Sequence, residues 1–166
     1  YEYLILVLYH NIFPSFYQYH YYNENIYYAR RNSFDGDWSS FKSIGNAINT
    51  PRNEAMAKIS TSGHKIYFSA CGWENVKGGC DLYEADFDTD NDFGVIDKVE
   101  PIELLNGEKW ESQPALSCDG TVIFFASNRK GGLGGTDLWM SKKDEKGMWG
   151  PAVNLGKEIN TQGDEE

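Results

Sequence analysis

Four glycines at 131–135, interrupted only by Leu133, form a stretch of this sequence whose composition could bind a phosphate. Such loops hold phosphate with their backbone N–H groups, and they lead into a helix N-terminus, usually through a Gly-Lys-Ser/Thr ending. Here the loop leads into residues 137–142, which read as a strand, and the ending is absent. The sequence therefore favours a turn between two strands over a phosphate-binding loop.

Asp86–Asp97 (DFDTDNDFGVID) places acidic residues at positions 1, 3, 5, 7 and 12 of a calcium-like loop. Asn91 replaces the glycine that such a loop needs at position 6, and the flanking segments read as strands. Solvated acids in a hairpin are the favoured interpretation. A calcium site remains the alternative, with Asp86, Asp88 and Asp90 as its weak candidate ligands.

Side chains suited to catalysis are few. The histidines are His10 and His20, in an irregular N-terminal segment, and His64, in a predicted turn. The chain has no Gly-x-Ser-x-Gly elbow, and residues 117–121 do not match the aspartate box of sialidase propellers. We assign no catalytic residue, expect no cofactor, and expect that the chain is not an enzyme.

Composition indicates one all-β domain. The chain has 166 residues, 15% aromatic residues, 17 glycines and 5 prolines, which suits many strands and turns. Its net charge of −10 disfavours nucleic acid and anionic lipid as partners. The longest apolar run, residues 3–9, is far too short to span a bilayer. Because the chain begins at Tyr1 without a signal peptide and stops in mid-pattern, we expect a piece of a longer protein.

Internal repetition determines the predicted architecture. Gly134–Trp139 (GGTDLW) repeats Gly78–Tyr83 (GGCDLY) at an offset of 56, and Leu116–Ser127 repeats Ile59–Ala70 at 57. Gly156–Glu166 repeats Gly45–Ala55 at 111, about twice that period. Two full units each predict four strands, at about 55–61, 65–70, 81–87 and 99–104, and at 113–117, 121–126, 137–142 and 152–155.

Four strands per unit of about 56 residues are typical of a β-propeller blade, a four-stranded antiparallel sheet that needs neighbours on both faces. We predict an incomplete propeller over residues 23–166. It consists of a partial blade at 23–54, blades at about 55–111 and 112–160, and the start of another at 161–166. Residues 1–22 depart from the pattern as an uncertain, degenerate segment, although YLILVL suits an apolar strand. Candidates for packing between blades are Tyr67, Phe68, Phe124, Phe125, Trp139 and Trp149.

Cys71 follows the second strand of its unit and Cys80 precedes the third. These strands are antiparallel neighbours, so a disulfide is geometrically permitted, with a Cα separation expected at ~4.4–6.8 Å. Two free thiols are the alternative. Cys118 lies in a predicted hairpin turn and is expected to be unpaired.

Glutamates recur at the start of the first strand of each unit, as Glu54, Glu111 and Glu165. These carboxylates could ring a channel mouth and attract a cationic partner. Alternatively, each accepts backbone hydrogen bonds and sets the register between blades, which we favour. The recurrent Asn49, Asn106 and Asn160 are interpreted as loop-capping residues.

The stretch from Leu116 to Trp139 resembles the TolB-type, WD-like propeller repeat, whose hallmark is a Ser-Pro-Asp-Gly turn. Here the turn is Ser117-Cys118-Asp119-Gly120, with cysteine in place of proline. WESQPALS, GGTDLW, GMWGPAVNLGKEINTQGDEE and the Cys71/Cys80 pair resemble the propeller segment of OmpA-family envelope proteins of Bacteroidetes-like bacteria. The resemblance covers about Asn23 to Glu166.

This resemblance implies a periplasmic or outer-membrane-associated scaffold that binds a protein partner, and peptidoglycan only through a domain outside this chain. An oxidising compartment would favour the Cys71–Cys80 bridge. The alternatives are a glycan-binding propeller, suggested by the aromatic residues, and an accessory propeller of a hydrolase or peptidase. We also expect an open arc of blades whose apolar terminal face promotes self-association.

Overall fold

A computed structural model describes residues 2–11, 22–87 and 96–166, with the backbone alone described for 2–11 and 22. The described residues form eleven strands in three antiparallel sheets and no helix. The predicted all-β class is therefore confirmed. None of the described residues belongs to a helix long and apolar enough to cross a membrane.

The second sheet matches the first complete predicted unit. Its strands follow one another in space as they do in sequence. They are β4 (Asn53–Ile59), β5 (Lys65–Cys71), β6 (Cys80–Phe87) and β7 (Ile96–Pro101). The four predicted strands are confirmed, with ends shifted by up to three residues. The acids of the calcium-like loop at 88–95, including Asp88 and Asp90, lie outside the described residues.

The third sheet repeats this order, from β8 on one edge to β11 on the other. Its strands are β8 (Glu111–Leu116), β9 (Val122–Ser127), β10 (Asp137–Lys142) and β11 (Val153–Asn154). The Asp119-Gly120 turn joins the first two strands, with Gly120 at a positive φ of 68° and its N–H donated to Ser117 O at 2.9 Å. Glycine adopts this backbone conformation without steric cost.

The first sheet contains β1 (Glu2–Asn11), β2 (Tyr22–Arg31) and β3 (Lys42–Ser43), in that order. The apolar run in the irregular N-terminal segment is thus part of a strand, as its composition suggested. β1 pairs along its whole length with β2, from Glu2 opposite Arg31 to Asn11 opposite Tyr22. Strand β2 corresponds by the period to β6 and β10.

An irregularity shared by the second and third sheets shows that they are copies of one unit. The ladder between the first two strands shifts register after Ala55 in β4 and after Ser112 in β8. At each shift a non-glycine residue has positive φ, 52° at Met56 and 57° at Gln113. β-bulges are designed features that bend a strand, so the two first strands are bent at the same place.

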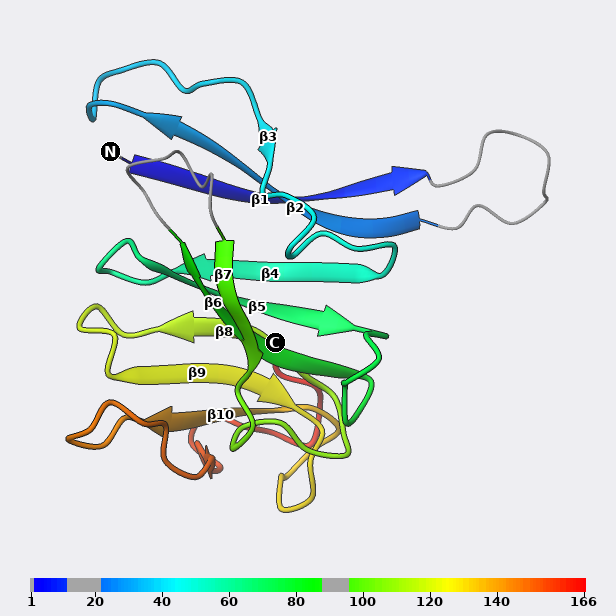
Figure 1. Cartoon of the computed structure of the whole chain (residues 1–166). Helices are drawn as coiled ribbons and strands as arrows, with labels where there is room; N and C mark the ends of the chain where they lie inside the picture. Colours follow the sequence, from blue (N-terminus) through cyan, green and yellow to red (C-terminus); the bar gives the residue numbers. More distant parts are fainter. Residues whose placement is uncertain (1, 12–21, 88–95) are drawn as a thin grey trace.

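The sheets are stacked in chain order, from the blue N-terminal sheet to the yellow and orange third sheet (Figure 1). One apolar cluster joins the first and second sheets and includes Ile26, Ile48 and Phe68. A second cluster joins the second and third sheets and includes Tyr67 and Phe125. The second sheet is therefore covered on both faces, as a repeat unit requires. The three sheets do not close into a ring within the described residues.

Candidate functional site

Three asparagines join the turn after each sheet to β2, β6 and β10, the strands that correspond to one another by the repeat. Asn106 Oδ1 accepts the N–H of Leu82 at 2.8 Å, and its Nδ2 donates to the carbonyl of the same residue at 2.8 Å. Asn49 makes the same pair of bonds with Ile26, at 2.8 and 2.9 Å. Asn160 repeats them with Leu138, at 2.8 and 3.0 Å. The side-chain amide thus extends the ladder as a neighbouring strand would, which agrees with the predicted capping role.

The recurrent glutamates hold the segment that leads from each turn into the next sheet. Glu111 is fully buried, and its carboxylate accepts the N–H of Gly107 at 2.8 Å and the hydroxyl of Ser127 at 2.8 Å. Arg129 lies 3.3 Å from the same carboxylate. These contacts join the connecting segment to β9, so Glu111 sets how the third sheet begins.

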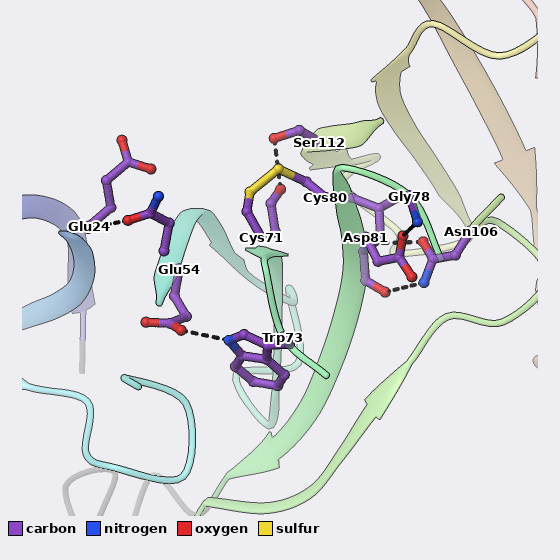
Figure 2. The surroundings of a disulfide bond; sticks show 12 residues. Glu24, Glu54, Cys71, Trp73, Gly78, Cys80, Asp81, Asn106 and Ser112 are labelled. Carbon is purple, nitrogen blue, oxygen red and sulfur yellow. Dashed lines mark hydrogen bonds between the residues drawn. A yellow bond between two sulfur atoms is a disulfide. The ribbon is translucent and has the colours of Figure 1, made fainter. Parts of the chain in front are cut away.

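Glu54 occupies the same position in the second sheet and is also fully buried. It accepts the backbone N–H of Thr50 at 3.0 Å and the indole N–H of Trp73 at 2.6 Å (Figure 2). Burial raises the pKa of Glu54 above its usual value, and the bonds from Thr50 and Trp73 oppose that shift. Both buried glutamates accept backbone N–H groups, as the register-setting interpretation expects, and the channel-mouth role stays a prediction.

Glu165 repeats the pattern at the end of the third sheet, where it is partly exposed. Its carboxylate accepts the N–H of Thr161 at 2.9 Å and the hydroxyl of the same residue. We call each set of one asparagine and the following glutamate, with their backbone partners, a latch. The described residues form three latches, centred on Asn49 and Glu54, Asn106 and Glu111, and Asn160 and Glu165.

A carboxylate of the protein binds the backbone N–H groups of the glycine-rich loop. The Asp137 carboxylate accepts the N–H groups of Leu133 at 3.0 Å and Gly134 at 3.4 Å. Asp81 does the same for Lys77 at 2.9 Å and Gly78 at 3.4 Å. Because an internal carboxylate takes the backbone donors that a phosphate would need, the loop functions as a strand connection.

The structure joins Cys71 at the end of β5 to Cys80 at the start of β6 by a disulfide (Figure 2). The Cα separation is 4.1 Å, slightly below the expected window. The two residues are direct cross-strand partners, and directly opposed antiparallel residues approach more closely than most bridged pairs. Cys118 is free and exposed.

We expect the bridge to be oxidised in protein made in an oxidising compartment, so denatured, non-reduced chain should contain one reactive thiol. Reduction should lower the free energy of unfolding by roughly 2–3 kcal/mol, because the closed loop has about ten residues. Thiol counting and urea denaturation with and without reductant measure both quantities. Three reactive thiols in such protein would contradict the bridge, and Cys118→Ser is the matched control that changes only the free thiol.

Asp86, the first residue of the calcium-like loop, is held by lysines. Lys65 Nζ lies 2.9 Å from its carboxylate, and Lys98 Nζ lies 3.6 Å away. The hydrogen bond from Lys65 lowers the pKa of Asp86. Among the described residues no group of three or more His, Cys, Asp or Glu side chains could hold a metal ion. Asp86 therefore forms ion pairs with Lys65 and Lys98.

Sequence reasoning missed a recurrent pairing of a cation with tryptophan. The ammonium of Lys143 lies 4.4 Å from the centre of the Trp149 ring, and the guanidinium of Arg31 lies 4.7 Å from that of Trp38. The signal was available, because the two tryptophans are separated by about twice the repeat period, and so are the two cations. The Arg31–Trp38 pair lies between β2 and β3, and the Lys143–Trp149 pair lies between β10 and β11, so both occupy the same place in the repeat.

A pocket of about 440 Å³ lies between the turns of the second and third sheets. Its lining includes Lys65, Tyr67 and Lys143. The ammonium of Lys143 is 3.4 Å from the Tyr67 hydroxyl, and burial lowers the pKa of this lysine. The pocket combines charged and hydroxyl groups from two sheets, so its shape depends on how the sheets stack.

The Asp119 turn offers a direct test of local geometry. Hydrogen bonds from the Ser117 hydroxyl at 2.6 Å and the Thr121 N–H at 3.0 Å lower the pKa of Asp119 to about 2. We expect Ser117→Ala to move this pKa toward the ordinary value, as followed by carboxyl NMR titration. The stability that these bonds contribute exists above the unfolded-state pKa and is lost as pH falls toward 2. Ser60→Ala, in the equivalent turn without an aspartate, should leave the titration unchanged.

The class of this protein rests on the geometry of its repeat. No protein-family model matches this chain, and no curated protein matches it significantly. What the structure itself defines is an all-β protein of three stacked antiparallel sheets, in which copies of one latch join each sheet to the next segment.

Proposed function

We propose that this chain is part of a β-propeller that acts as a non-enzymatic protein-interaction scaffold. The recurrence of the latch carries the proposal. Asn49, Asn106 and Asn160 fix the same backbone position in successive sheets. A repeated connection of this kind places each sheet against its neighbour in one orientation, which is how repeat proteins build an extended surface.

The hydrogen-bond partners of the carboxylates support a scaffold function rather than a catalytic one. Glu54 and Glu111 bind backbone N–H groups of the connecting segments. Asp81 and Asp137 bind those of the loops before the third strands. Carboxylates with these partners stabilise the connections between strands and sheets.

The envelope location rests on two supports. One is the resemblance of the repeat to the propeller segment of OmpA-family proteins, which implies the periplasm or an outer-membrane association. The other is the Cys71–Cys80 disulfide, because disulfides persist in oxidising compartments. Contact with peptidoglycan would then come from another domain of the full-length protein, and this chain would contact a protein partner.

Photo-crosslinking tests the scaffold. Leu104 is exposed beside Met148, where the second and third sheets meet. A photoreactive amino acid at Leu104, in chain exported to the periplasm of a Bacteroidetes-type bacterium, should give discrete protein adducts. The same probe in a Gly78→Ala background should lose them, because that change disturbs the stacking. Equal adducts in both backgrounds, or none from the folded chain, would contradict the proposal.

A glycan-binding function is the second candidate, and the exposed Phe34 and Trp38 favour it. Both rings contact the Arg31 guanidinium, at 4.9 and 4.7 Å from their centres, beside a pocket of about 240 Å³. Sugars commonly pack on exposed aromatic rings. Titration with soluble peptidoglycan fragments should then change tryptophan fluorescence in the natural chain but not in Trp38→Ala.

A further inference from the structure

The outer face of the third sheet carries exposed apolar side chains. The equivalent faces of the first and second sheets are each buried by the sheet that follows. Ile48 and Leu105 precede the latch asparagines, and each is fully buried by the following sheet. Ile159 stands at the same position before Asn160, yet 52% of its surface is exposed. The third sheet thus presents to solvent the kind of face that the first two sheets bury.

The interface between the second and third sheets, the central interface, shows which side chains pack against such a face. Trp149 of the third sheet packs edge-on against Tyr67 of the second, with ring centres 6.1 Å apart. Lys143 covers the same tryptophan. Ala152 also packs against this cluster. A tyrosine from one sheet therefore meets a cation–tryptophan pair from the next sheet.

Both halves of this contact recur at the two ends of the stack. Phe124 lies one repeat period after Tyr67 and is half-buried. Its neighbours Ile123 and Phe125 are in the core shared with the second sheet, so strand alternation points Phe124 to the outer side. At the other end, Trp38 corresponds to Trp149 and is 41% exposed beneath Arg31.

We infer that two copies of this chain associate head to tail, with the outer face of the third sheet of one copy on the first sheet of the other. Phe124 and Ile159 of one copy would meet Trp38 and Phe41 of its neighbour. Phe41 lies two repeat periods before Ala152 and is exposed. A second copy of this chain is the partner, because the chain itself carries both complementary surfaces. The interface between the second and third sheets already joins the equivalents of these two surfaces.

Such an interface is heterologous, since different surfaces of the two copies meet, and it continues to further copies unless it closes. Each copy carries a net charge of −10, so charge repulsion opposes association at low salt. Screening should therefore strengthen association as salt increases. The inference uses only the observed repeat and needs no envelope partner; in a propeller, further blades would cover the same two end faces.

Sedimentation velocity of the 166-residue chain over a wide concentration range tests the inference. We expect reversible association, which Ile159→Glu weakens by about thirtyfold or more, the loss typical of a central interface residue. Leu104→Glu is the matched control. Leu104 is similarly exposed, at 57%, in the equivalent turn after the second sheet, and its replacement should leave association unchanged.

Complementation of two variants identifies the orientation. Trp38→Ala should also abolish self-association, and Phe41→Ser provides a second variant of the same surface if the first unfolds. Mixing Trp38→Ala with Ile159→Glu should restore a one-to-one dimer, because one intact surface remains on each. A monomeric natural chain at all concentrations would overturn the inference, as would loss in only one variant or a mixture that stays monomeric while both variants remain folded.

Discussion

Gly78→Ala is expected to destabilise the protein by about 3 kcal/mol, the upper range for inserting atoms into a packed interior. A Cβ on Gly78 would lie 1.5 Å from the carbonyl oxygen of Lys109, in the segment that leads to the third sheet. The obstacle is backbone, which cannot rotate away as a flexible side chain can. Accommodation therefore requires moving the segment that carries Glu111, and with it the junction between the two sheets. Urea denaturation measures the loss.

The matched control is Gly120→Ala. A Cβ there meets nothing within 4 Å, but the residue has φ of +68°, so we expect a cost of about 1 kcal/mol from backbone strain alone. The equivalent Gly134 has the same obstacle, with the carbonyl oxygen of Gly163 at 2.1 Å. Gly134→Ala should therefore resemble Gly78→Ala. Equal, small losses at Gly78 and Gly120 would show that the segment around Lys109 is not held in place.

The strands were predictable because their signals are local. Apolar residues flank the Asp119-Gly120 turn, and β9 and β10 follow the predicted limits within one residue. The fourth strand was less predictable. It was expected at about 99–104, but β7 ends at Pro101. The chain then turns so that the N–H groups of Leu105 and Asn106 bond to Ile102 O, because the latch requires a turn there.

The burial of the glutamates could not be read from their type, since carboxylates are rarely fully buried without partners. Their partners come from the turn four residues earlier, at Thr50, Gly107 and Thr161. That spacing is visible once the copies are aligned. The cation–tryptophan pairs were missed for a similar reason, because Arg31 and Lys143 are different residue types at one position of the repeat. The exposed end faces of the stack could not be predicted from the sequence, because the exposure of Ile159 depends on whether a neighbouring sheet covers it.

Asn106→Ala is expected to lower the free energy of unfolding by about 3 kcal/mol, because it leaves two buried backbone groups without partners at roughly 1–3 kcal/mol each. The N–H and the carbonyl of Leu82 both bond to the Asn106 amide, and all three groups are buried. No smaller side chain reaches both groups. Asn106→Asp should recover only part of the loss, since a carboxylate accepts from the N–H but cannot donate to the carbonyl.

Asn49→Ala provides the comparison that separates burial from hydrogen bonding. Asn49 makes the same two bonds to Ile26, but it is only partly buried. Water can replace part of what the side chain supplied there, so we expect about 1 kcal/mol of destabilisation. Urea denaturation of the two alanine variants measures the difference. If Asn49→Ala cost as much as Asn106→Ala, the latch would act through backbone geometry common to all copies. A larger loss at Asn106 would instead show that burial of the latch asparagine decides how much its two hydrogen bonds contribute to stability.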